Sequence, residues 1–224
     1  ARTELPPKHS GINAGTSMPL TITNASAAGT GRLNAATGAT TPIFNLHIDG
    51  GGLITMPNGF GGNSGVATTI DVNNNGSGSN GLIQLNGVAK YGNGTLNVTG
   101  GNGYNLSIAG FDNNAGTAGT SVLNPTTANL TLGSYSSSTN FAKTLQLNGT
   151  TVGNSVTGSI ANGTAGTVAL TKANTGTWVL SGTNSYTGAT SVNAGTVVIN
   201  GDSSAATGTV TVADGASLTL NMAS

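Results

Sequence analysis

Residues 171–220 read TKANTGTWVLSGTNSYTGATSVNAGTVVINGDSSAATGTVTVADGASLTL, and this stretch decides the fold. Five short runs of β-branched and apolar residues recur in it: TWVL, TSV, TVVI, TVTV and SLTL. Gly, Asn, Asp or Ser follows each run within a few positions, which predicts short strands joined by turns and leaves no room for a helix. Repetition on this scale predicts stacked units that build a core only together.

The rest of the chain shows the same rhythm. Strand candidates recur roughly every 8 to 14 residues, joined by turns rich in Gly, Asn and Ser. The remaining predicted strands are 19–23, 43–48, 53–56, 66–72, 82–85, 95–99, 104–108, 121–123, 129–132, 144–147, 155–160 and 167–170.

Regular short strands fit a β-sandwich, a barrel or a β-solenoid, and three features favour the solenoid. The strands are very short, and aliphatic residues alternate with polar ones, as in 130–132 and 145–147. Aromatic residues make up only 4% of the chain, with a single Trp, whereas sandwich cores lean more on aromatics. We therefore predict an all-β solenoid filled by stacked aliphatic side chains. At about 20–25 residues per turn, the chain would make roughly nine to eleven turns.

Composition narrows the functional classes. The 224 residues include 37 Gly but only 6 basic and 6 acidic residues, so the net charge is zero. Nucleic-acid binding requires neutralisation of phosphates, and docking on anionic membranes requires basic clusters, so neither partner is expected. The sequence has no Cys and no apolar run of about 18 residues, which favours an exported chain without a transmembrane helix. Because ARTELPPKHS carries neither Met nor an apolar segment, we expect that a signal peptide has already been removed.

One segment carries a recognisable motif. Residues 172–200 resemble the autotransporter-associated β-strand repeat, although Asn174 replaces a glycine of the family pattern. The matching positions are Lys172, Gly176, Thr177, Trp178, Leu180, Ser181, Gly182, Asn184, Tyr186, Gly188, Thr190, Val192, Gly195, Val197 and Ile199. The resemblance implies a right-handed parallel β-helix on an exported bacterial protein, located at the cell surface or outside the cell. It implies no activity, because the repeats of this family are scaffolding.

The repeat residues also have a physical interpretation. Tyr186 is expected on a corner as a surface aromatic, with plain packing favoured over stacking on a glycan. Asn184 is expected to form a side-chain ladder or to cap a turn. The residues predicted to pack in the core are Trp178, Leu180, Val192, Val197 and Ile199. The residues predicted at corners are Gly182, Gly188 and Gly195.

Catalytic material is sparse. The acidic residues are scattered and form no local motif, although pairing across turns stays open; they are Glu4, Asp49, Asp71, Asp112, Asp202 and Asp214. His9 and His47 lie in different segments and suggest neither a catalytic triad nor a metal site. We therefore expect no catalytic residues, no metal and no cofactor.

The two ends of the chain carry the main functional hypothesis. We divide the sequence into an N-terminal arm at 1–23, solenoid turns at 24–120 and repeat-like turns at 121–224. The arm, with its candidate donor strand at 19–23, is expected to add to a neighbouring copy. The residues assigned to this contact are Pro6, Pro7, Leu20 and Ile22 in the arm, and Leu218, Leu220 and Met222 in the last turn.

Head-to-tail stacking of this kind would make a filament, since the contact does not close on itself. We accordingly predict a non-enzymatic subunit of an extracellular bacterial fibre, whose partner is a second copy of itself. The first alternative is a passenger segment of an autotransporter-like surface adhesin, with glycans or cell surfaces as partners. The least favoured alternative is a β-helix carbohydrate-active enzyme.

Overall fold

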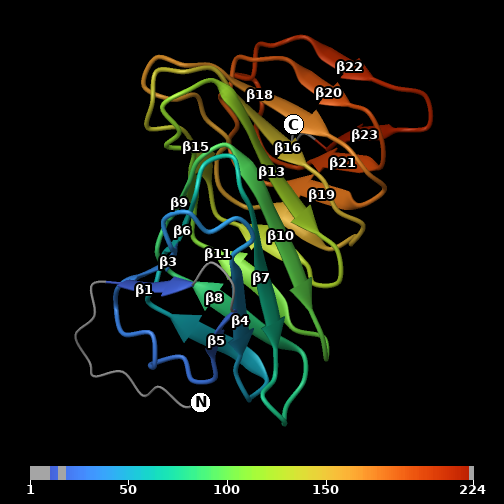
Figure 1. The fold of residues 1–224 in the computed structure, drawn as a ribbon. Coiled ribbons are helices and arrows are strands. Elements are labelled where there is room, and N and C mark those ends of the chain that lie inside the picture. Colours follow the sequence, from blue (N-terminus) through green and yellow to red (C-terminus); the bar gives the residue numbers. More distant parts are fainter. Residues whose placement is uncertain (1–10, 15–18, 222–224) are drawn as a thin grey trace.

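The computed structural model describes residues 11–14 and 19–221, which form 23 strands in three parallel sheets (Figure 1). Sheet A contains β1 (Gly11–Ala14), β3 (Arg32–Ala35), β6 (Phe60–Gly62), β9 (Ala89–Tyr91), β12 (Phe111–Asp112) and β15 (Tyr135–Ser136). Sheet B contains β2 (Leu20–Ile22), β4 (Ile43–His47), β7 (Ala67–Asn73), β10 (Gly94–Gly100), β13 (Gly119–Pro125), β16 (Lys143–Leu147), β18 (Val168–Lys172), β20 (Thr190–Val192) and β22 (Val210–Val212). Sheet C contains β5 (Gly52–Met56), β8 (Gly81–Leu85), β11 (Asn105–Ile108), β14 (Leu130–Leu132), β17 (Asn154–Val156), β19 (Thr177–Leu180), β21 (Thr196–Ile199) and β23 (Ser217–Leu220).

The chain winds through the three sheets in turn and returns to each one a strand further along. This is a β-solenoid of about 8 turns, and the predicted all-β solenoid is confirmed. In the described part of the chain no helix is long and apolar enough to cross a membrane. The labels of Figure 1 place β4 and β5 at one end of the stack and β22 and β23 at the other.

The turns differ in length along the stack. In sheet B, Ala67 pairs with Thr95, which is 28 residues further along the chain. Near the C-terminal end Leu170 pairs with Thr190, only 20 residues further along. The solenoid therefore narrows toward β22. The predicted nine to eleven turns were too many, because most turns are longer than the 20–25 residues assumed.

Alternation along each strand creates the core. In sheet C one inward-facing column continues without a change of register through every turn. Its members are Met56, Leu85, Ile108, Leu132, Val156, Leu180, Ile199 and Leu220. All but the last of these side chains are buried. The same side of the sheet thus meets the interior in every turn, as a two-residue period requires.

The interior of the N-terminal two-thirds also holds a row of aromatic rings. Neighbouring ring centroids lie 5.4 to 5.8 Å apart, and the row consists of Phe44, Phe60, Tyr91, Phe111 and Tyr135. All five residues are buried. The prediction of a purely aliphatic interior is therefore wrong for these turns. Their greater length encloses a wider cross-section, which leaves room for rings.

Candidate functional site

The repeat at 172–200 forms one turn and part of the next, from the end of β18 to the end of β21. The five residues predicted to pack inward are all buried. Trp178, the largest of them, pairs with Asn154 on one side and Val197 on the other. Its indole Nε1 donates a hydrogen bond to the Asn148 carbonyl over 2.8 Å, so its single polar atom is satisfied inside the core.

The three predicted corner glycines all lie where chains approach closely. A Cβ at Gly188 would come within 2.5 Å of the Val168 carbonyl oxygen, and one at Gly182 would overlap the Gly158 carbonyl. Gly195 has in addition a φ of +69°, which L side chains rarely adopt. These positions let successive turns stack without a gap.

Asn184 and Tyr186 are core residues of the same turn. The Asn184 side chain accepts a hydrogen bond from the Ile160 amide at 3.1 Å and donates one to the Ser203 hydroxyl at 3.0 Å. It thereby connects three successive turns. Tyr186 is 2% exposed, and its hydroxyl lies 2.8 Å from the Thr190 hydroxyl. The expectation of a surface aromatic at Tyr186 is therefore wrong, and this ring is not available for stacking on a glycan.

A buried lysine is the feature that the sequence pattern missed. Lys172 is fully buried, and its Nζ donates to the carbonyls of Ala173 and Asn174, both at 2.6 Å, and of Ala194 at 3.2 Å. Burial lowers its pKa from 10.5 to about 8. The pattern showed that Lys172 matched the repeat, but its partners are backbone atoms, one of them a turn away, and no sequence signal identifies them.

The assembly residues predicted at the chain ends lie at opposite ends of the solenoid. Leu20 and Ile22 belong to β2, which pairs with β4 of the same chain, and Ile22 is buried. At the other end Leu218 is partly buried and Leu220 is 59% exposed. Pro6, Pro7 and Met222 lie outside the described residues.

The acidic residues mostly stabilise loops. Asp49 Oδ1 accepts the amides of Asn75 and Ser77, both at 2.8 Å, so this carboxylate fixes a corner of the next turn. Asp112 and Asp202 likewise accept loop amides, from Ser138 at 2.7 Å and Ser204 at 2.8 Å respectively.

The structure does bring one acid and one base together across turns. His47 Nε2 lies 2.7 Å from Asp71 Oδ2, and the Thr99 hydroxyl donates to the other oxygen of Asp71. Asp71 thus separates the histidine from the hydroxyl, so the imidazole does not contact a nucleophile as a catalytic triad requires. Within 11–14 and 19–221, no three residues of the type His, Cys, Asp or Glu are grouped as metal ligands would be.

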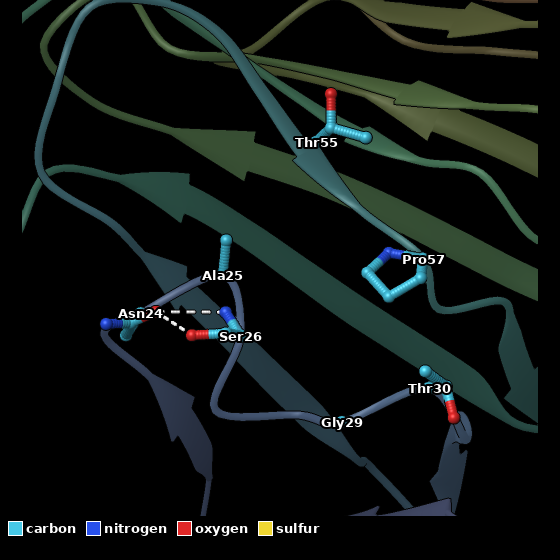
Figure 2. A pocket seen from close by; sticks show the side chains of 7 residues that line it. All are labelled: Asn24, Ala25, Ser26, Gly29, Thr30, Thr55 and Pro57. Carbon is cyan, nitrogen blue, oxygen red and sulfur yellow. Dashed lines mark hydrogen bonds between the residues drawn. The ribbon is translucent and has the colours of Figure 1, made fainter. Parts of the chain in front are cut away.

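A cavity of about 380 Å³ lies near the N-terminal end, between the loop at 24–30 and the end of β5 (Figure 2). Asn24 accepts hydrogen bonds from the amide and the hydroxyl of Ser26, at 2.9 and 2.7 Å, and Thr55 and Pro57 form the opposite wall. None of the lining residues is charged or an imidazole, so the cavity provides no acid–base chemistry.

Comparison with known proteins places the motif. The family model described as passenger-associated-transport-repeat matches residues 170–199. No curated protein matches the chain, and no solved structure matches it either. The matched segment runs from β18 to the end of β21, so it coincides with the turn built around Trp178 and Lys172. The resemblance found at 172–200 is thereby confirmed.

Proposed function

Because this β-solenoid carries a passenger-type repeat, we propose that the chain is a non-enzymatic segment of an autotransporter passenger, displayed at or released from the surface of a bacterium. The observation that carries the proposal is the coincidence of the repeat at 170–199 with a complete, closely packed turn of the solenoid. The absence of Cys fits this role, since a chain without thiols crosses an oxidising compartment with no risk of cross-linking.

Display on intact cells tests this function. The chain is placed between a secretion signal and the membrane barrel of an autotransporter, and cells are treated with an external protease. We expect a surface-exposed fragment that resists the protease, because the solenoid leaves few unpaired segments. A variant with Leu180→Asp, which places a charge in the core, serves as the control and should be digested completely. Retention of the wild-type chain inside the cells would contradict the proposal.

A fibre subunit is the second candidate, and the last described turn favours it. Val210 is 57% exposed and Val212 43% exposed, although in sheet B they continue columns whose earlier members, Thr190 and Val192, are buried. Such an end is completed by a further turn, which belongs either to the same chain or to a second copy. If copies stack, deletion of residues 1–23 should abolish polymerisation. Unchanged fibres after this deletion would rule out a role of the arm.

Adhesion is the function that we propose for a displayed segment. The surface has almost no net charge and is rich in Thr, Ser, Asn and Gly, which favours neutral partners such as glycans over charged polymers. A glycan array with the purified chain measures this binding directly. Cleavage of any glycan in the same experiment would contradict the non-enzymatic assignment.

A further inference from the structure

An ammonium group occupies a position in the core where its neighbours are apolar. In sheet B, Lys172 lies in an inward-facing column between Leu147 and Val192, both of which are fully buried. A lysine in such a column is normally excluded, because a buried charge without partners is costly. Lys172 therefore needs a local structure that replaces water.

Backbone carbonyls supply that structure. The three donors of Nζ meet three acceptors, the carbonyl oxygens of Ala173 and Asn174 in its own corner and of Ala194 in the corner of the next turn. Among the described residues the only ion pair joins His47 to Asp71, so no carboxylate lies within salt-bridge distance of Lys172. The ammonium is thus held by dipoles alone and connects two successive corners.

The corner backbone is shaped around this group. Asn174 has a φ of 59°, in the left-handed region, which directs the carbonyls of the corner toward Nζ. Gly195, in the corner above, also has a positive φ, and a Cβ there would lie 2.7 Å from Nζ and 2.6 Å from the Gly176 carbonyl oxygen. Lysine and glycine, 23 positions apart in the sequence, therefore depend on each other for space.

We propose that the carbonyls of Ala173, Asn174 and Ala194 form a cation-binding cage, and that the Lys172 ammonium is its resident cation. The cage fixes two successive corners of the repeat without a metal ion. Lys143 repeats the arrangement independently in another corner, where its Nζ donates to the carbonyls of Ala115 at 2.7 Å and Thr117 at 2.6 Å. A buried cation that caps corner carbonyls is thus used twice in this chain.

Amide hydrogen exchange on two matched variants tests the cage. Lys172→Met keeps the length of the side chain but leaves the carbonyls without donors, and Lys143→Met does the same in the other corner. We expect Lys172→Met to accelerate exchange about tenfold at the amides of Asn193 and Thr196, and to leave the amide of Gly119 unchanged. Lys143→Met should show the reverse. Exchange that changes equally in both corners, or in neither, would overturn the proposal.

Rescue by a small cation separates the cage from ordinary packing. Lys172→Ala leaves an apolar channel that ends at the carbonyls, and propylammonium carries both the chain and the N–H donors that the cage requires. We expect propylammonium to restore slow exchange at Asn193, and tetramethylammonium at the same ionic strength to have no effect, since it has no N–H group. Equal effects of the two cations, or no rescue, would contradict the cage.

A measurement on the wild-type protein covers the case in which a variant does not fold. Exposed ammonium protons, such as those of Lys90, exchange with water too fast to be seen by nitrogen-15 NMR near neutral pH. We expect two protected ammonium signals from lysine-labelled protein at about pH 6, where both buried groups are charged. A spectrum without protected ammonium signals would overturn the proposal.

Discussion

At the scale of single residues, the repeat is defined by how each side chain meets the turn before and the turn after. Trp178 fills the core and donates to the carbonyl of Asn148, a residue of the preceding turn. Leu180 pairs with Val156 before it and Ile199 after it. A substitution in this turn is therefore felt in three turns, and its cost reports on the packing of the stack.

Truncation of the tryptophan should be severe. We expect Trp178→Ala to lower the free energy of unfolding by about 3–5 kcal/mol, because it removes a fully buried side chain and leaves a cavity. Val179→Ala, at the neighbouring outward-facing position, should cost less than about 1 kcal/mol. Urea denaturation followed by circular dichroism measures both. Equal losses would show that Trp178 is not a core residue.

Two glycines with the same backbone conformation separate strain from close approach. Gly195 and Gly215 have φ of +69° and +78°, but only at Gly195 would an added Cβ have neighbours within 4 Å. Gly215→Ala should therefore cost about 1 kcal/mol from backbone strain alone, and Gly195→Ala distinctly more. Thermal unfolding of both variants decides this. A similar melting temperature for the two would contradict the close contact of Gly195 with the lysine cage.

The buried lysine should make stability depend on pH. Burial lowers the pKa of Lys172 to about 8, whereas the unfolded chain keeps the ordinary value of 10.5. Between these values unfolding takes up a proton, so the free energy of unfolding should rise with pH from about 7.5 to 9.5. Burial also lowers the pKa of Lys143, which acts in the same direction.

Lys172→Met provides the control for this pH dependence. Its stability should rise less steeply over the same window, and urea denaturation at three pH values measures the difference. The window ends below pH 10 because burial raises the pKa values of Tyr91, Tyr135 and Tyr186, which would reverse the slope above it. An unchanged slope in the variant would show that Lys172 is not the titrating group.

At the scale of elements, the sequence predicted two of the three sheets. Each strand candidate beyond residue 18 corresponds to a strand of sheet B or sheet C, because those strands alternate aliphatic and polar residues over several positions. Sheet A was missed entirely. Its strands read GINA, RLNA, FGG, AKY, FD and YS, which are too short and too irregular to show a period.

Sheet A is specified by its neighbours instead. Its strands form where the solenoid brings backbone groups of successive turns to hydrogen-bonding distance, and aromatic side chains from β6, β9, β12 and β15 then stack inside. The core residues and corner glycines of the repeat could be predicted, since their apolar alternation and glycine spacing are visible in the sequence. The lysine cage could not, because its acceptors are main-chain oxygens.

The aromatic row offers a test at this scale. Phe111 packs edge-on against Tyr91 and stacks on Tyr135, with centroids 5.8 and 5.5 Å away. We expect Phe111→Leu to lower the free energy of unfolding by about 1–3 kcal/mol through lost ring contacts and poorer filling. Phe141→Leu, at a ring that is 44% exposed, should change it by less than about 0.5 kcal/mol. Two equal values would contradict the stacked row.

At the scale of the whole molecule, the stack is asymmetric. Long turns with aromatic interiors form the end around β4 and β5, and short turns with the passenger-type repeat lead to β22 and β23 (Figure 1). Inward-facing columns reach the last described turn, where Val210 and Leu220 are exposed. The whole-molecule question is therefore whether this surface is covered by a further turn of the same polypeptide or by a second copy.

Electron microscopy of the purified chain at neutral pH answers this question most directly. A passenger segment of about 8 turns, with strands about 4.8 Å apart, predicts separate rods about 40 Å long. Long uniform fibres that repeat at this distance would contradict the passenger segment and establish head-to-tail stacking of copies.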